Sequence, residues 1–435
     1  MCLEPAPPPP SRLTRRGVLA GAAALAGTAA ALSTAGPAAA RPTDQAHQAH
    51  QAHQAHQAAP YGDLLIEGGT LLDPVTGEVT EDAVVVIRSG KVDRAGPRRS
   101  GAVPAGLPRL DAGGQWVLPG LVDAHIHLAT VGEAREAVIK GATSARSGST
   151  TFYQDIAVRE LARRLPVQAP RLRAAGVFVT PDMGDSVLAD PDLAPLAALK
   201  GGVRSAEALR RVVDVNVARG ADVIKTRVNE RAGLPDQDPL SQVYSYEQLA
   251  EVVTAARRGG KGVLCHSYSE QGCHHAVRAG IRSLEHGVFV GERTLHEMRS
   301  RGTYFTPTLA AIAGLVESSD PVLAERGRTY LPVLKDAVRA AHEVGVPLVA
   351  GTDSSGGEVT PIGHEVELMH AAGLSPLDAI RTATTNAARL LGLSGTVGRL
   401  APGCAGDVLV VGADPLSDVS ALSRPVRVVR AGRIC

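Results

Sequence analysis

The chain has 435 residues, 44% of them hydrophobic, and a formal net charge of +1. This length suits a barrel with an accessory domain, and the balanced charge excludes the basic field that nucleic-acid binding needs. Aromatic residues make up only 3% of the chain, so stacking platforms for single strands or sugars are not expected either. We therefore expect a globular protein with a large core and no nucleic-acid partner.

The first forty residues have the features of an export signal. Arg15 and Arg16 precede a weakly hydrophobic stretch at 20–35, and residues 37–40 (PAAA) offer a small-residue cleavage site. A twin arginine in this position is typical of the twin-arginine export route. A membrane anchor is the alternative, but the stretch is rich in Ala and Gly and poor in Leu. We expect residues 1–40 to be removed, leaving an extracellular or cell-envelope protein without a stable membrane anchor.

Residues 41–60 contain the repeat QAH. His47, His50, His53 and His56 recur at every third residue, which places them on one edge of a polyproline-II segment. Two interpretations stay open, a disordered linker and a weak metal-collecting arm.

Residues 118–397 repeat one pattern, in which a helical segment ends in Gly and is followed by a short apolar run. Gly suits the left-handed position after a helix, and a short apolar run indicates a buried parallel strand. The expected strands are 117–128 (VLPGLVDAHIHL), 149–154 (STTFYQ), 172–179 (LRAAGVFV), 221–226 (ADVIKT), 262–267 (GVLCHS), 282–287 (RSLEHG), 304–309 (YFTPTL) and 347–353 (PLVAGTD). Strands that alternate with helices in this way predict a (β/α)8 TIM barrel, with a doubly wound open sheet as the alternative.

The flanks differ from this core. Residues 61–117 and 398–435 consist of short apolar runs separated by turns. Neither segment is long enough to bury a core alone. We expect them to form one small β-sandwich together, built from both ends of the chain.

Metal-binding residue types follow the expected strands at the end where barrel active sites form. His125 and His127 are alternate residues of the first strand, so their imidazoles face the same side and suit a Zn-like ion. The other candidates are Lys225, His266, His286 and Asp353, each at the end of a further strand. A lone His-X-His pair is weak evidence of a site, but candidates on five strands together predict a metal centre in the barrel mouth.

Lys225 requires a separate argument. A buried cation beside divalent metal ions is strongly disfavoured, and a neutral lysine amine can add CO2 to become an anionic carbamate. Two carbamate oxygens can bridge two metal ions. The alternative is an ordinary lysine paired with Asp222 or Glu230 on the surface, which the preceding apolar pair Val223-Ile224 disfavours.

These motifs resemble the amidohydrolase superfamily, close to its imidazolonepropionase-like and prolidase-like branch. The resemblance runs from about Asp63 to the C-terminus and rests on PGLVDAHIH, GADVIK, the His266 strand, SLEHG, AGTD, TATTNAARLLG and GRLAPGCAGDVLVV. It implies two divalent ions, with zinc as the first expectation, and a carbamate on the bridging lysine. The ligand set that it implies is His125, His127 and Asp353 for one ion, His266 and His286 for the other, and Lys225 shared.

The resemblance also implies a reaction. The metal ions lower the pKa of a bridging water, and Asp353 carries its proton to the leaving group. We expect hydrolysis of C–N bonds, amide or peptide-like, with a dipeptidase or prolidase-like activity. The alternatives are a lactonase, esterase or phosphotriesterase with the same metal site and, in another class, a metal-binding or scavenging protein. The oligomeric state, including a homo-oligomer, stays open.

Three segments depart from the family pattern. Many relatives have an arginine–aspartate pair after strand two, where residues 150–155 read TTFYQD, and a Gly-Gly-His loop after strand three, where residues 179–185 read VTPDMGD. The loop at 226–239 (TRVNERAGLPDQDP) is also unusual. These changes leave the metal ligands intact and put the substrate in doubt.

Three residues are candidates for substrate contact. Tyr268 lies two residues after His266 on the same strand face, although core packing would also explain it. A prolidase-like substrate has a free carboxylate, which needs a cationic or amide partner. Arg227 and Arg231 are the candidates for that partner, and solvated loop charges are the alternative.

Overall fold

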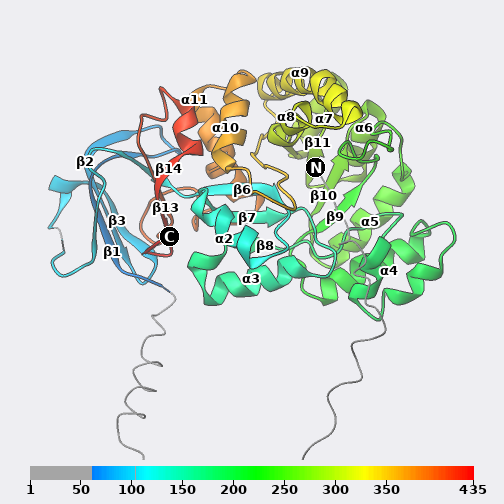
Figure 1. The fold of residues 1–435 in the computed structure, drawn as a ribbon, viewed down its shortest axis with the longest axis horizontal. Coiled ribbons are helices and arrows are strands. Elements are labelled where there is room, and N and C mark those ends of the chain that lie inside the picture. Colours follow the sequence, from blue (N-terminus) through cyan, green and yellow to red (C-terminus); the bar gives the residue numbers. More distant parts are fainter. Residues whose placement is uncertain (1–60, 103) are drawn as a thin grey trace, which may run out of the picture. The chain divides into compact units, whose positions relative to one another are not determined.

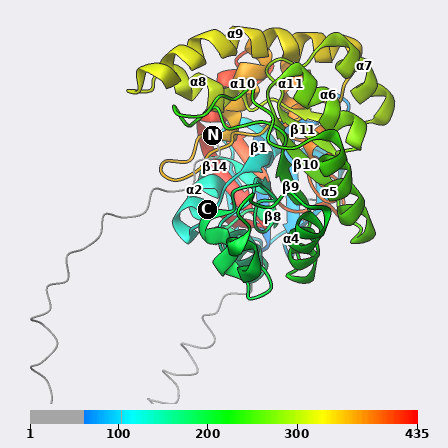
Figure 2. The same cartoon turned by 90° about the vertical axis from the view of Figure 1, so that its right-hand side faces the viewer.

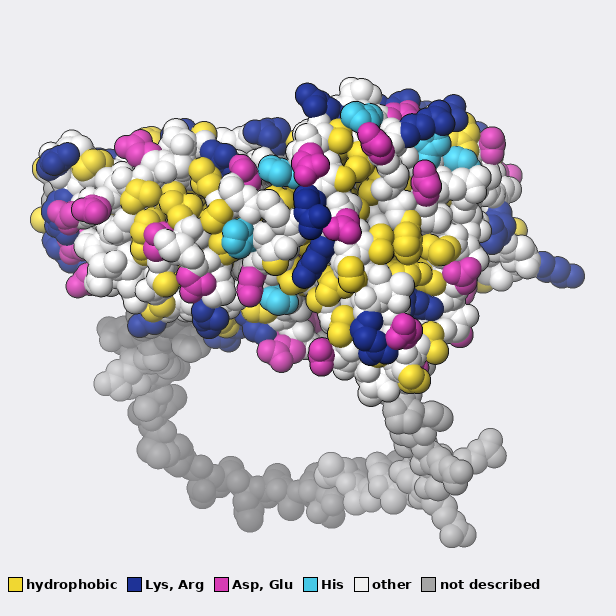
Figure 3. All heavy atoms as spheres, turned by 90° about the horizontal axis from the view of Figure 1, so that it is seen from above, with side chains coloured by type: hydrophobic (Ala, Val, Ile, Leu, Met, Phe, Trp, Pro, Cys, Tyr) yellow, Lys and Arg dark blue, Asp and Glu magenta, His cyan; other side chains and the backbone are white. Residues whose placement is uncertain are grey.

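The computed structural model describes residues 61–102 and 104–435, which belong to one compact unit. The expectations for an export signal and a His-rich linker lie outside the described residues. None of the described helices combines the length and the apolar character that a bilayer crossing requires. Lysines and arginines lie among acidic side chains on the face in Figure 3, in keeping with the balanced charge.

Both ends of the described chain meet in one eight-stranded sheet, with the order β15-β14-β13-β5-β1-β2-β3 and β4 paired to β1 (Figure 1). The strands are β1 Leu64–Leu72, β2 Val79–Arg88, β3 Lys91–Pro97, β4 Arg109–Asp111, β5 Trp116–Pro119, β13 Val408–Val411, β14 Pro425–Arg430 and β15 Arg433–Ile434. The two ends join where β5 runs antiparallel to β13, with Leu118 opposite Leu409. Both flanking segments therefore contribute strands to one sheet.

The central strands form two parallel groups. They are β6 Leu121–Ile126, β7 Ala142–Ser147 and β8 Arg171–Arg173 in one group, and β9 Ile224–Arg227, β10 Val263–Ser267, β11 Ser283–His286 and β12 Tyr304–Thr306 in the other. Backbone contacts link the groups at both edges. Val179 bridges to Thr226, Phe305 bridges to Leu348, and Ala124 N donates to Ala350 O at 2.9 Å. The last contact returns the chain to its first central strand.

Helices follow the central strands and surround them (Figure 2). They are α2 Val131–Ile139, α3 Gln154–Arg164, α4 Ala206–Ala218, α5 Tyr246–Arg258, α6 Glu270–Ala279, α7 Glu292–Arg301, α8 Leu309–Val316, α9 Pro321–Val344, α10 Ile362–Ala371, α11 Pro376–Thr382 and α12 Thr385–Leu390. Gly280 and Gly302 end α6 and α7 in the left-handed conformation, with φ of 93° and 66°, and strands β11 and β12 follow them. The helix–Gly–strand pattern is thus confirmed for these two helices.

Four expected strands need correction. The first, 117–128, is two strands, because Gly120 separates β5 from β6 and the two belong to different sheets. The second, 149–154, is wrong: these residues form a turn and the start of α3, and the strand is β7. The third, 172–179, pairs only in β8 Arg171–Arg173 and at the isolated bridge of Val179. The eighth, 347–353, makes only the isolated bridge at Leu348. Strand β7 reads ATSARS. All six residues are buried, but they are small or polar and so do not form the apolar run that indicates a buried strand.

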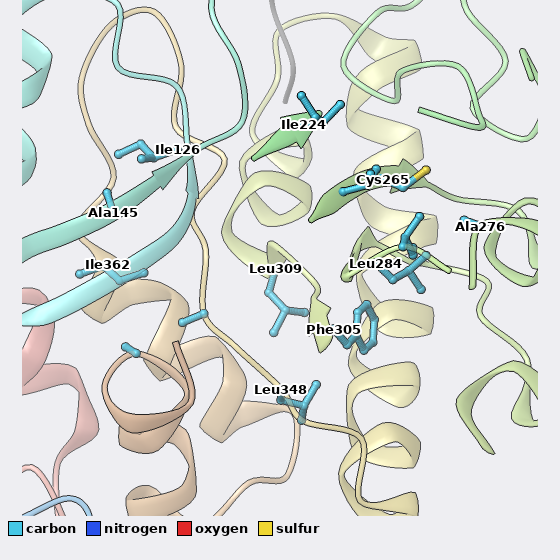
Figure 4. Packing of buried hydrophobic residues seen from close by; sticks show 14 of the residues in the cluster. Ile126, Ala145, Ile224, Cys265, Ala276, Leu284, Phe305, Leu309, Leu348 and Ile362 are labelled. Carbon is cyan, nitrogen blue, oxygen red and sulfur yellow. The ribbon is translucent and has the colours of Figure 1, made fainter. Parts of the chain in front are cut away.

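The hydrophobic core lies between the central strands and their helices. Figure 4 shows side chains of this cluster from β6 and β7, including Ile126 and Ala145, and from the second group, including Ile224, Leu284 and Phe305. All five are buried. Burial of apolar surface is the main stabilising term for such a core, at about 25 cal/mol per Å². The packing holds the ends of the central strands in fixed positions.

Candidate metal centre

The six expected metal ligands converge on one place. His125 is in β6, Lys225 in β9, His266 in β10 and His286 in β11, while His127 and Asp353 follow β6 and the Leu348 bridge. Lys225 Nζ lies 3.0 Å from His125 Nε2, and Asp353 Oδ1 lies 3.1 Å from His127 Nε2. The rings of His266 and His286 are 4.4 Å apart between centroids. Ligand atoms of His125, His286 and Asp353 all lie within 4.8 Å of one another.

The backbone at this place is unusual. His286 has a φ of 68° and Asp353 a φ of 55°. Left-handed conformations are costly for residues other than glycine and persist where the surrounding structure enforces them, often at functional sites. Here the Asp353 amide donates to His125 O at 2.7 Å. The conformation of Asp353 is thereby tied to the strand that carries the His-X-His pair.

Each of the four histidines has one ring nitrogen held by a hydrogen-bond acceptor. His127 Nδ1 donates to Ser149 O at 2.7 Å, and His266 Nε2 donates to Glu230 O at 3.0 Å. His125 Nδ1 lies 2.6 Å from Glu285 Oε2, and His286 Nδ1 lies 2.7 Å from Thr308 Oγ1. Because these partners accept the ring proton, the other nitrogen keeps its lone pair. Metal-binding histidines are oriented in this way, so the residues fit a divalent ion.

Gly148 leaves room for such an ion. A Cβ at this position would lie 2.5 Å from His127 Nε2 and 2.6 Å from His125 Nε2. Both nitrogens therefore converge on a space beside the backbone of Gly148. A side chain of any size would fill it, which adds a steric requirement to the donor set.

Glu285 and Arg146 are functional candidates that we did not single out from the sequence. Arg146, in β7, donates from Nη2 to both oxygens of Glu285, at 2.9 and 3.0 Å. Burial alone would raise the pKa of Glu285, but Arg146 and the hydrogen bond from His125 hold it well below its usual range. A buried carboxylate thus stays ionised beside the metal ligand. Glu285 precedes His286 in a predicted strand, but Arg146 lies in β7, which the sequence pattern did not predict.

The position of Arg146 also corrects one departure from the family pattern. Strand two is β7 and ends in Arg146-Ser147, so an arginine is present at its end and an aspartate is not. The carboxylate of Asp155 hydrogen-bonds to Ser147 and accepts from Ala175 N at 2.7 Å. A carboxylate therefore reaches the end of this strand from the next helix.

Two further buried carboxylates support the ligands. Asp123 accepts from Thr352 Oγ1 at 2.7 Å, and burial raises its pKa to about 6. Glu365, in α10, accepts from Leu309 N and Ala310 N at the start of α8, at 2.9 and 2.7 Å. Burial raises the pKa of Glu365 to about 8, and nearby Asp123 adds to this effect. Both residues hold backbone segments next to the centre.

The candidate substrate residues have different surroundings. Tyr268 is buried, with its ring stacked on that of His286 at 5.3 Å and edge-on to His266 at 4.9 Å. Arg227 is buried, donates to Thr180 Oγ1 at 2.8 Å and pairs with Glu230, so it is not a solvated loop charge. Burial lowers its pKa.

Arg231 differs from Arg227 in its hydrogen bonding. Arg231 is partly buried, and its Nε has no hydrogen-bond partner within residues 61–102 and 104–435. It therefore has a donor available for a substrate.

Lys225 is fully buried, and the acidic residues considered as its surface partners pair with other residues, Asp222 with Arg159 and Glu230 with Arg227. The surface ion pair considered for Lys225 is thus wrong.

The chain is similar to known proteins over most of its length. The sequence pattern of the amidohydrolase family matches residues 116–435, more than half of the chain. Ochratoxinase of Aspergillus niger is 27% identical over 405 residues, covering 82% of this chain and 82% of that protein. Dihydroorotase of Pelotomaculum thermopropionicum is 26% identical over 424 residues, covering 85% of this chain and 92% of that protein.

A solved structure has the same fold. A Xaa-Pro dipeptidase with methionine bound in its active site has a TM-score of 0.76 and 23% identity, and the likeness covers 86% of this chain and 99% of that one. The family match includes every one of the six converging residues, from His125 to Asp353. This chain therefore belongs to the amidohydrolase family.

Proposed function

We propose that this chain is a metal-dependent hydrolase that cleaves C–N bonds, amide or peptide-like, in a small substrate. The observation that carries the proposal is the convergence of six N- and O-donor side chains, four of them histidines with one ring nitrogen already held. Membership of the amidohydrolase family supports the same class of reaction. Chelator-treated protein should lose hydrolysis and regain it on addition of zinc. Unchanged turnover after complete metal removal would contradict the proposal.

The ligand set that we propose is His125, His127 and Asp353 for one ion, His266 and His286 for a second, and a carbamate on Lys225 between them. Lys225 is fully buried beside His125 Nε2, where an ammonium group would repel a cation. Lys225→Ala should lose most of the bound metal, with Lys261→Ala as a matched control outside the centre. Growth with ¹³C-bicarbonate should give a carbamate signal in wild-type protein and none in Lys225→Ala.

The chain's own residues would then perform the proton transfers. Divalent ions at these ligands, when bound, acidify a water molecule and polarise the substrate carbonyl. We assign Asp353 to take the proton from the attacking water and deliver it to the leaving nitrogen, because an amine leaves poorly unless it is protonated. Asp353→Asn should lower turnover about 100-fold or more with a smaller change in substrate affinity.

The substrate that we favour is a dipeptide or N-acyl amino acid with a free carboxylate. Arg231 supports this choice, since a guanidinium with an unused buried donor suits a carboxylate. The similarity of this chain to a Xaa-Pro dipeptidase and an ochratoxinase is compatible with this choice. A panel of such amides should be hydrolysed. Turnover of lactones or phosphotriesters alone would keep the metal hydrolase and overturn the substrate.

We further propose that the central strands form one closed (β/α)8 barrel beside a composite β-sandwich of residues 61–117 and 398–435. Support for closure comes from the backbone links Val179–Thr226, Phe305–Leu348 and Ala124–Ala350. Hydrogen exchange should find the amide of Ala124 strongly protected. Rapid exchange there would favour an open sheet.

We also propose that residues 1–40 direct export by the twin-arginine route and that residues 41–60 are a linker. That route suits an enzyme whose metal ions bind only to the folded chain. Replacing Arg15 and Arg16 by lysine should keep the protein inside the cell. Unchanged secretion of this variant would indicate another route.

A further inference from the structure

A pocket lined by arginines lies apart from the metal centre, where β8 and α3 meet β14. It has a volume of about 240 Å³, and the arginines that line it are Arg159, Arg163, Arg171, Arg173 and Arg430. The other lining residues are apolar or aromatic, and none is acidic. Pockets for drug-sized molecules have volumes of about 300–1,000 Å³, so this one suits something smaller.

Positive charge exceeds negative charge around this pocket. Asp407 pairs with Arg171 at 2.9 Å and with Arg430 at 3.0 Å. Asp222 pairs with Arg159 at 2.7 Å and lies 3.8 Å from Arg173. Glu160 pairs with both Arg159, at 3.2 Å, and Arg163, at 2.8 Å. Five guanidinium groups therefore share three carboxylates, which leaves two positive charges uncompensated.

Part of the excess positive charge is buried. The side chain of Arg430 is only 3% exposed, and its Nε has no hydrogen-bond partner in the part of the chain that the structure describes. Burial lowers the pKa of Arg430, Asp407 opposes this effect, and the like charge of Arg171 adds to it. A buried charge is costly unless it is paired and hydrogen-bonded. A ligand that neutralised this group would therefore stabilise the fold.

We propose that this pocket binds a small, doubly charged oxoanion, such as hydrogen phosphate, sulfate or the phosphate group of a phosphomonoester. The two negative charges of such an ion match the two uncompensated guanidinium charges. Guanidinium groups present planar pairs of N–H donors that bind oxoanions bidentately. The proposal does not depend on the hydrolase function, because none of the metal-ligand candidates lines the pocket.

Calorimetric titration of the full chain with inorganic phosphate tests the proposal, at an ionic strength held constant with chloride. We expect one site per chain and a rise in the unfolding temperature that grows with phosphate concentration. Arg173→Gln should weaken binding about tenfold or more, because it removes a charge-assisted contact. Arg339→Gln is the matched control: this exposed α9 arginine pairs with Asp336, and its loss should leave binding unchanged.

A second arm compares glycerol phosphate with inorganic phosphate and so separates a phosphomonoester from the free ion. Tighter binding of either one supports the proposal and names the source of the anion. Absence of phosphate and sulfate binding to the wild-type chain would overturn it and leave the arginines as an ion-pair network. Binding that persists in Arg173→Gln and Arg171→Gln but disappears on metal removal would also overturn it, because the ion would then sit on the metal centre.

Discussion

Nδ1 of His125 lies 2.6 Å from Oε2 of Glu285, and both side chains are fully buried. Arg146 holds both oxygens of the same carboxylate from the other side. This chain of contacts fixes the proton of His125 on Nδ1 and directs its Nε2 toward Asp353, 3.4 Å away. The charge of Glu285 thereby acts on the centre through His125.

Glu285→Gln should weaken metal binding about 10- to 100-fold, the usual effect of removing a carboxylate behind a metal-binding histidine. Metal affinity measured by competition with a chromophoric chelator checks this. The single change also leaves Arg146 buried without a counter-charge, which costs roughly 3–5 kcal/mol of stability. The double variant Arg146→Met/Glu285→Gln should regain part of that stability but not the metal affinity. Recovery of both would reduce Glu285 to a structural role.

Gly148→Ala should abolish metal binding without removing any ligand. Its methyl group would lie 2.5 Å from His127 Nε2 and 2.6 Å from His125 Nε2, in the space on which the two nitrogens converge. Elemental analysis of the folded variant measures the effect. Gly314→Ala is the control, because a Cβ at this position in α8 meets no atom within 4 Å. A Gly148→Ala protein with its full metal content would show that the ions bind elsewhere.

The stability of the metal-free protein should depend on the ionisation of Glu285 in acid. The pKa of Glu285 is lowered in the folded chain from its ordinary value of 4.5. The unfolded chain therefore takes up this proton first, so the stabilising contribution is present above about pH 4.5 and is lost as the pH falls. Urea unfolding at pH 7 and pH 4 should show a steeper loss for wild type than for Glu285→Gln. Equal slopes would contradict the ionised Arg146–Glu285 pair.

The two arginines of the 226–239 loop should behave differently. Arg231→Ala should raise KM for carboxylate-bearing amides more than it lowers kcat, because its unused donor is the one available to substrate. Arg227→Ala should chiefly lower the unfolding temperature, because it breaks the contacts with Thr180 and Glu230. Steady-state kinetics and thermal unfolding of both variants separate the roles. A KM effect confined to Arg227→Ala would reverse the assignment.

The sequence sufficed to predict two of the strands that carry ligands, although the strand expected before Asp353 forms only the bridge at Leu348. His266 and His286 end short apolar runs, and those runs are the parallel strands β10 and β11. Strand β7 could not be predicted in this way, because its six residues are small or polar. The pattern placed the second strand at 149–154 instead. Its burial depends on tertiary contacts that no local pattern reports.

Arg146, Glu285 and Gly148, which surround the ligands, were harder to predict for the same reason. The pairing of Arg146 with Glu285 joins positions 139 residues apart, and only the arrangement of the strands brings them together. Gly148 lies in a loop, where a glycine by itself indicates no function. Its role follows only from the positions of the two imidazoles beside it. Ligand chemistry can thus be read from residue type and spacing, whereas orientation and free space need the three-dimensional structure.

The pairing of β5 with β13 has a consequence for how the protein is made. Leu118 pairs with Leu409, so nearly three hundred residues must leave the ribosome between these two partners. Until then, the edge of β5 has exposed backbone donors and acceptors, which are a template for association with other chains. Ribosomes stalled before residue 408 should therefore carry a chain whose first sheet is incomplete, and a chaperone that shields β5 during translation would raise the yield of folded enzyme.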